Sequence, residues 1–113
     1  LDSMAIFANA TVYFEFDKSS LTSKSIQTLK SAVDALNENS TIQVTLSGHA
    51  DERGTREYNL ALGQRRAESV SDYLVLNGIK KSRITVKSFG EEKPLAYGQD
   101  EASYAKNRRV EIN

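Results

Sequence analysis

The chain has 113 residues, 39% of them hydrophobic and 27% charged, which suits one soluble globular domain, and no apolar run approaches the roughly 20 residues of a membrane span. Because 15 basic residues balance 15 acidic ones, the net charge is zero, which argues against a general nucleic-acid binder. The absence of cysteine and the single histidine, His49, disfavour a metalloenzyme or a nucleophilic hydrolase and favour a binding module.

The amino-terminal third of the chain predicts a strand followed by a helix. Residues 1–10 show no regular pattern, so we expect an irregular lead-in to one domain that spans residues 11–113. Apolar and polar side chains alternate strictly over residues 11–16, with Phe16 on the apolar side, which is typical of a strand with one buried face. Apolar side chains at helical spacing then predict a helix over residues 22–38.

The middle of the chain predicts a strand, a loop and a second helix. Alternating apolar side chains predict a strand over residues 41–47, which Gly48 ends. Residues 49–57 are polar and include a glycine, so we expect an exposed loop that takes no part in the core. A second apolar stripe predicts a helix over residues 58–76, and Gly78 stands where a left-handed C-cap is expected.

The remainder of the chain completes an α/β (α+β) sandwich. We expect a strand over residues 83–89, a long loop over 90–100, a short helix over 101–106 capped by Asp100, and a last strand over 109–112. Because every strand is amphipathic, the fold is predicted to be one mixed sheet of about four strands with its helices packed on one face. The predicted core includes Val12, Phe14, Ile26, Leu29, Val33, Val44 and Leu46.

The densest polar cluster follows the second strand and continues into the second helix. Ligands favour this position in open α/β sheets, and a helix N-terminus offers unpaired N–H groups to an anion. Asn59, Leu62 and Arg66 are three and four residues apart, so they share one helical face. If the loop folds back, Asp51 and Arg66 would suit a zwitterion, with its ammonium on the carboxylate and its carboxylate on the guanidinium. A structural salt bridge between the same two side chains is the alternative explanation.

Three other features have simpler explanations. The segment at residues 14–17 is expected to be an ordinary strand that ends in an acidic turn. Arg108 and Arg109, which lead into the last strand, are expected to be solvated, and His49 is expected to hydrogen-bond near the end of its strand. The loop at residues 48–54 is not a phosphate loop, because it lacks the Gly-Lys-Ser/Thr ending.

Three stretches together resemble the OmpA-like C-terminal domain family. They lie at residues 13–17, at 48–67 and at 107–110. The second begins Gly-His-Ala-Asp-Glu-Arg-Gly-Thr-Arg-Glu-Tyr-Asn, which is typical of one subfamily, the peptidoglycan-associated lipoproteins of Gram-negative bacteria. The resemblance covers residues 11–113 and implies the α/β sandwich of that family.

The resemblance implies non-catalytic binding of peptidoglycan in the periplasm, with no cofactor, no metal and no catalytic residue. Family members hold the stem peptide chiefly through diaminopimelate, whose side chain carries an ammonium and a carboxylate. The aspartate of the family maps to Asp51 and its arginine to Arg66. Supporting contacts map to Phe16, Asp17, Asn59, Leu62 and Arg108.

The resemblance also implies partners. The domain would link the outer membrane to the cell wall as part of the Tol-Pal system, and TolB would bind on a surface that overlaps the peptidoglycan site. Members of the subfamily are tethered to the outer membrane by a lipid on an N-terminal cysteine. Because this chain has neither a cysteine nor a signal peptide, we expect that this part is absent from it or that the tether differs. We expect a monomer that does not bind nucleic acid.

Two alternative functions remain open. The peptidoglycan-anchoring domain of an OmpA-type porin or of a MotB-type stator would share the ligand and differ in its tether. An enzyme acting on the cell wall would need a nucleophile or a metal, for which one histidine and no cysteine are a poor basis.

Overall fold

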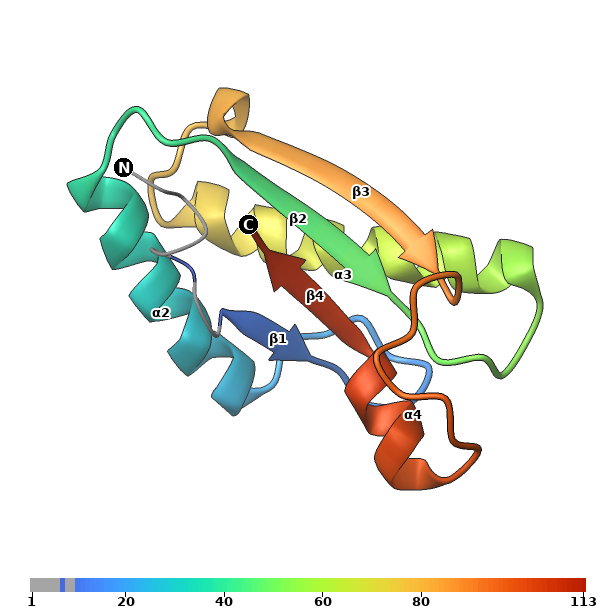
Figure 1. Ribbon diagram of the computed structural model, residues 1–113. Coiled ribbons are helices and arrows are strands. Elements are labelled where there is room, and N and C mark those ends of the chain that lie inside the picture. The colour runs from blue at the N-terminus through green and yellow to red at the C-terminus, as the bar shows by residue number, and fades with distance from the viewer. Residues whose placement is uncertain (1–6, 8–9) are drawn as a thin grey trace.

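The structure, a computed structural model, describes residue 7 and residues 10–113 (Figure 1). Most of the lead-in predicted at residues 1–10 therefore lies outside the described residues. Each predicted helix and strand is present in the predicted order, with bounds that differ by a few residues. In chain order the elements are β1 (Thr11–Tyr13), α2 (Ser23–Glu38), β2 (Val44–His49), α3 (Arg56–Leu76), the short 3-10 helix η1 (Lys81–Arg83), β3 (Ile84–Gly90), α4 (Glu101–Asn107) and β4 (Arg109–Ile112).

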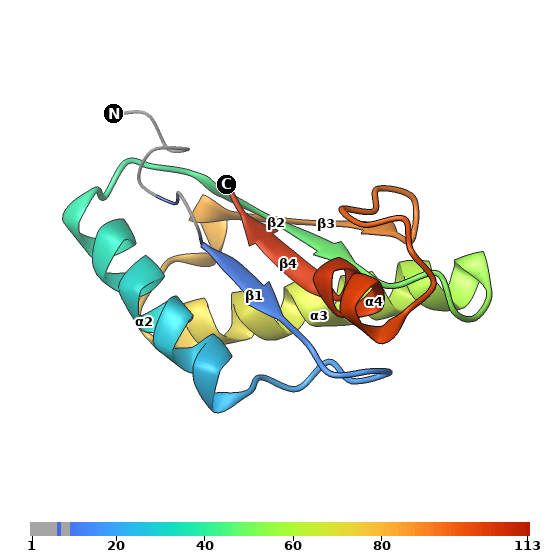
Figure 2. The same cartoon turned by 60° about the horizontal axis from the view of Figure 1, so that its bottom comes forward.

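The four strands form one mixed sheet in the order β1-β4-β2-β3. β2 and β3 are parallel neighbours, with Val44 opposite Ile84, whereas β4 runs antiparallel between β1 and β2. Val110 of β4 lies opposite Val12 on one side and opposite Gly48 on the other. Both views show α2 and α3 against the same face of the sheet, while α4 lies at one end of it, directly before β4 (Figures 1 and 2). This arrangement confirms the predicted fold class.

The core fills the space between the sheet and the helices α2 and α3. Five of the residues predicted for it are buried, namely Val12, Phe14, Leu29, Val44 and Leu46. The other two, Ile26 and Val33, are only half-buried, because α2 directs Leu29 and Leu36 most deeply toward the sheet. Phe7, which falls within the predicted lead-in, is also buried in this core.

The first strand ends earlier than its alternating pattern predicts. β1 extends only to Tyr13, and Phe16, which the pattern places on the buried face, is 54% exposed. Asp17 then adopts a left-handed backbone conformation with φ 57°, which aspartate tolerates better than most residues. Because the backbone leaves the sheet at this point, Phe16 and Asp17 project beside the loop that follows β2.

Two glycines allow α3 to lie directly on the sheet. The sequence predicts that Gly48 ends its strand, but the structure places this residue inside β2. A Cβ atom at Gly48 would collide with the carbonyl group of Gly63 in α3, and a Cβ atom at Gly63 would collide with the hydroxyl group of Ser88 in β3. The missing side chains therefore bring the amino-terminal half of α3 against the end of β2.

Candidate functional site

The loop after β2 begins as part of the interior, which corrects the predicted exposed loop at residues 49–57. His49, Ala50 and Asp51 are all buried, and exposure begins only at Glu52. The backbone N–H of Ala50 donates a hydrogen bond to the carbonyl of Gly90 at 2.9 Å, so the chain follows β3 beyond the last paired residue of β2. The polar side chains of His49 and Asp51 therefore belong to a buried site, whereas Glu52 and residues 54–57 are exposed, as predicted.

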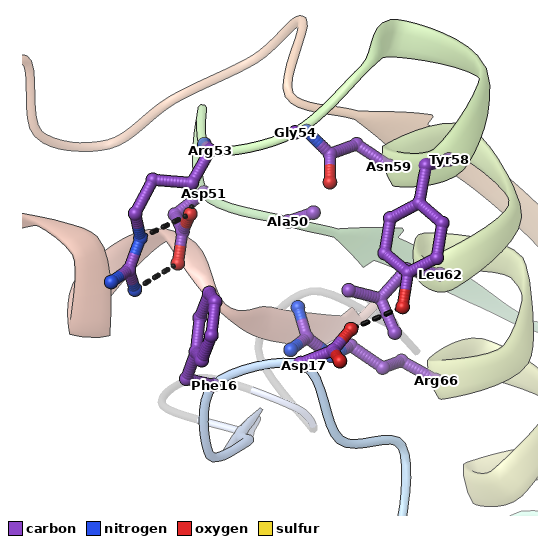
Figure 3. A pocket seen from close by; sticks show the side chains of 10 residues that line it. All are labelled: Phe16, Asp17, Ala50, Asp51, Arg53, Gly54, Tyr58, Asn59, Leu62 and Arg66. Atoms are coloured by element: carbon purple, nitrogen blue, oxygen red, sulfur yellow. Dashed lines mark hydrogen bonds and ion pairs between the residues drawn. The ribbon is translucent and has the colours of Figure 1, made fainter.

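A pocket of about 250 Å³ opens between this loop, the turn after β1 and the first turns of α3 (Figure 3). It brings together segments that are far apart in the sequence. Its walls consist of Phe16, Asp17, Ala50, Asp51, Arg53, Gly54, Tyr58, Asn59, Leu62 and Arg66. Six of the seven residues proposed from the sequence are among them, and the seventh, Arg108, lies behind the pocket against Asp51.

Asp51 pairs with Arg53 and Arg108. It does not form the salt bridge with Arg66 that was the alternative explanation from the sequence. Its Oδ1 accepts hydrogen bonds from the backbone N–H of Arg53 at 3.0 Å and from Nε of the same residue at 3.1 Å. Its Oδ2 accepts one from Nη2 of Arg53 at 2.8 Å and lies 3.6 Å from Nη1 of Arg108. Burial acts to raise the pKa of the Asp51 carboxyl, but the hydrogen bonds and charge of Arg53, with the charge of Arg108, lower it on balance.

Arg66 is a fully buried cation that backbone carbonyl groups hold in place. Its Nε donates to the carbonyl of Lys18 at 2.8 Å, Nη1 to that of His49 at 2.9 Å, and Nη2 to that of Glu15 at 3.1 Å. A guanidinium has five N–H donors, so one on each terminal nitrogen is left over from these three bonds. Burial, with the nearby charge of Arg108, lowers the pKa of Arg66 to about 10, so the group stays charged at neutral pH.

Arg108 and Arg109 are buried, which contradicts the expectation that both are solvated. Arg108 donates from Nε to the carbonyl of Phe14 and from Nη2 to Glu101, both at 2.9 Å, while Nη1 has no hydrogen-bond partner among the described residues. Arg109 donates from Nε to Glu111 at 2.7 Å. Both are buried because groups from other segments hold them: Arg108 lies against Phe14, Asp51 and Glu101. Arg109 also donates to the backbone carbonyls of Asn107 and Lys93.

Three residues that the sequence does not assign to the site also contribute to it: Arg53 and Tyr58 line the pocket, and Tyr104 lies beside Arg53. The guanidinium carbon of Arg53 lies 4.0 Å from the ring centre of Phe16 and 4.3 Å from that of Tyr104, so two aromatic rings flank it. The hydroxyl group of Tyr58 donates a hydrogen bond to Asp17 on the side of the pocket opposite Arg53 (Figure 3). Arg53 stands only two residues after Asp51, and this nearness in the sequence could have indicated that the two side chains pair. The pattern of α4 gives no comparable indication that Tyr104 lies beside the site.

His49 does not make the hydrogen bond expected near the end of its strand. Both ring nitrogens are buried without a hydrogen-bond partner among the described residues, and the ring stacks on Phe89 with 5.5 Å between the centres. Burial and the charge of Arg109 lower the pKa of His49 to about 4, so the ring is neutral at physiological pH.

Among residue 7 and residues 10–113, no group of three or more His, Cys, Asp or Glu side chains is placed to hold a metal ion. No helix in this part of the chain is long and apolar enough to cross a membrane.

Comparisons with known proteins agree with this geometry. A family model described as the OmpA family matches residues 13–108. The peptidoglycan-associated lipoprotein of Pseudomonas aeruginosa is 48% identical over 111 residues, which are 98% of this chain and 66% of that protein. The crystal structure of the peptidoglycan-associated lipoprotein from Burkholderia pseudomallei has a TM-score of 0.90 and 39% identity, and the match covers 98% of both chains. These findings confirm the subfamily resemblance, and the chain spans only about two thirds of the length of the Pseudomonas relative.

A more distant protein shares the fold alone. The C-terminal domain of Helicobacter pylori MotB has a TM-score of 0.83 at 19% identity, over 91% of this chain and 81% of that one. The arrangement of a mixed sheet with helices on one face is therefore common to proteins whose sequences differ widely.

Proposed function

The chain belongs to the OmpA family, and on that premise we propose that it binds peptidoglycan, without catalysing a reaction on it, through diaminopimelate in the stem peptide. The name of the Pseudomonas relative, a peptidoglycan-associated lipoprotein, supports the ligand class. The observation that carries the proposal concerns the buried guanidinium of Arg66, which lines a pocket that also contains the carboxylate of Asp51. Two of its N–H donors have no acceptor among the described residues.

The pocket offers complementary groups to both charges of the diaminopimelate side chain. The terminal N–H groups of Arg66 would donate to the side-chain carboxylate, and their direction is set by three backbone carbonyls before any ligand arrives. Asp51 would receive the ammonium. Apolar groups of Phe16, Ala50 and Leu62 line the space in between, where the methylene groups of the ligand would pack.

The remaining proposed residues would act from the walls. Asn59 donates from its amide nitrogen to Glu91 at 2.9 Å, which directs its side chain away from α3 and toward the loop after β3. Asp17 accepts a hydrogen bond from Tyr58, and these two side chains lie on the side of the pocket opposite Arg53 (Figure 3). Arg108 would act indirectly, because it contacts Asp51 from behind and keeps positive charge beside that carboxylate.

We extend the proposal to the cellular setting. As in a peptidoglycan-associated lipoprotein, the domain would lie in the periplasm and connect the outer membrane to the cell wall. TolB would bind as part of the Tol-Pal system, over a surface that includes the pocket mouth. The exposed side chain of Phe16 and the partly exposed side chain of Arg53 at that mouth are available for such a contact.

Calorimetry with two soluble muropeptides that differ only in their third residue tests the proposed ligand. Lysine has the side-chain amine of diaminopimelate but no side-chain carboxylate, so it leaves the donors of Arg66 without a partner. One such charge-assisted contact is worth about 1.5–3 kcal/mol, so the lysine peptide should bind about 10- to 100-fold more weakly.

The control for that comparison is Arg56→Ala. Arg56 is a mostly exposed residue that pairs with Glu92 outside the pocket, so the variant should keep the wild-type ratio of the two affinities. Equal affinities of the wild-type protein for the two peptides would contradict the role of Arg66, and the absence of binding to both would contradict the proposed function.

A further inference from the structure

The carboxylate of Asp51 is already occupied in the structure. An ionised carboxylate offers about four acceptor positions. Arg53 uses three of them, through its backbone N–H, its Nε and its Nη2, and the remaining side of Oδ2 faces Nη1 of Arg108 at 3.6 Å. A cationic group that enters the pocket therefore meets a carboxylate whose charge is already balanced by two guanidinium groups.

Of the two arginines, Arg53 is the one that is free to leave. Its side chain is 35% exposed, whereas that of Arg108 is 8% exposed and is anchored to the carbonyl of Phe14 and to Glu101. Glu101 is mostly exposed, and its Oε2 lies 3.8 Å from Nη2 of Arg53, so a second carboxylate is close to a released guanidinium. Movement of Arg53 would consequently leave no charge buried without a partner.

We infer that Arg53 is an internal counter-ion that competes with the ammonium of the ligand for Asp51 and so sets the affinity and charge selectivity of the pocket. The inference rests on the proposed function, in which Asp51 receives that ammonium. Binding then requires exchange of one cation for another on the same carboxylate. The apparent affinity for the ligand is the intrinsic affinity multiplied by the fraction of molecules in which Arg53 has left Asp51. The rings of Phe16 and Tyr104, which flank the guanidinium, favour the occupied state.

The inference predicts that removal of the Arg53 charge strengthens binding. In Arg53→Gln, the affinity for a soluble muropeptide with a free diaminopimelate side-chain amine should rise up to about fivefold, the upper end for a partly exposed ion pair. The same peptide acetylated on that amine cannot use Asp51 as an ammonium would, so its affinity should not change. Calorimetry on both peptides measures the effect as a ratio, which a merely structural role of Arg53 would leave unaltered.

Two further variants complete the test. Arg56→Gln removes the same charge three residues away, outside the pocket, and should bind both peptides as the wild type does, which controls for a general electrostatic effect. Tyr104→Leu removes one of the two rings beside Arg53 and should strengthen binding of the free-amine peptide by a smaller factor, which tests the same competition without altering the loop.

The outcomes separate this inference from the proposed function. Weaker binding of the free-amine peptide by Arg53→Gln would overturn the inference, because Arg53 would then be a ligand contact. An equal gain for both peptides would also overturn it, because the gain would not depend on the ammonium. A wild-type protein that binds neither peptide would overturn the proposed function itself, and the inference with it.

Discussion

Replacement of Asp51 by alanine is expected to destabilise the fold as well as to weaken binding. The Asp51 side chain is 4% exposed, and its carboxylate lies between the guanidinium groups of Arg53 and Arg108. Without it, Arg53 is able to turn toward water. Arg108 has no such freedom, because it is buried, so its Nη1, which makes no hydrogen bond in the described part of the chain, would also lose the Asp51 carboxylate at 3.6 Å.

The size of the effect follows from the partners that Arg108 keeps. A buried polar group that loses its partner costs about 1–3 kcal/mol, and removal of one member of a fully buried ion pair costs about 3–5 kcal/mol. Arg108 retains its bonds to Phe14 and Glu101, so we expect a loss of about 2 kcal/mol in the free energy of unfolding. For a domain of this length, about 1 kcal/mol corresponds to roughly 4 °C, so Tm should fall by about 8 °C.

Thermal melts and sacculus pull-downs measure the two consequences separately. Asp51→Ala should melt about 8 °C lower and, after folding is verified at the assay temperature, should fail to bind sacculi, because a buried charge-paired contact is worth about 2–5 kcal/mol of binding. Leu29→Ala is the matched control. It removes a fully buried side chain far from the pocket, so it should cost about 2–5 kcal/mol of stability while its folded fraction still binds.

Each half of this prediction has its own refutation. A loop aspartate in water would cost no more than about 0.5 kcal/mol, so a Tm within about 2 °C of the wild type would refute the argument from the buried pair with Arg108. An Asp51→Ala protein that is destabilised but still binds sacculi would refute the role of this carboxylate in ligand binding.

Two other predictions concern pH and the protein partner. Since the pKa of His49 is about 4 in the folded protein and about 6.5 in the unfolded chain, the unfolded state takes up a proton first, and stability should fall by up to about 3 kcal/mol as pH decreases from 6.5 to 4. In His49→Phe, which keeps the stacking on Phe89, denaturant titrations should show a smaller decline, and parallel curves for the two proteins would disprove this origin. If TolB covers the pocket mouth, a saturating soluble muropeptide should reduce its affinity for the domain, and an unchanged affinity in a pull-down titration would exclude a shared surface.

Local pattern determined the order of the elements and the fold class. The alternation over residues 41–47 and the helical spacing over residues 22–38 depend only on which face of an element is buried, and each segment carries that information itself. Gly78 has φ 95°, as its position after the second helix predicts, because a left-handed residue there depends on the helix end alone. Six of the seven residues proposed for the site line one pocket, so the sequence motifs predicted side chains that the fold brings together, and their role in binding stays a prediction.

The pairing of charges within the site depended on tertiary structure. Spacing brought Asp51 and Arg66 toward one another as candidates, but the direction of each side chain is set by groups from other parts of the chain. Backbone carbonyls from the turn after β1 and from the end of β2 hold Arg66, and Asp51 instead turns toward Arg53 and Arg108. The nearness of Arg53 in the sequence is a local signal, but no local pattern indicates that Arg108, rather than Arg66, is the second cation beside Asp51.

Burial of the charged residues was decided by segments that are distant in the sequence. Arg108 and Arg109 have the composition of a solvated segment, yet the fold places Phe14 and Asp51 against Arg108 and the carbonyl of Lys93 against Arg109. The opposite holds for Phe16, whose alternation predicts burial and whose position beyond the end of β1 leaves it exposed beside the pocket. Sequence periodicity describes one element at a time, whereas exposure is a property of the neighbours that the folded chain places around that element.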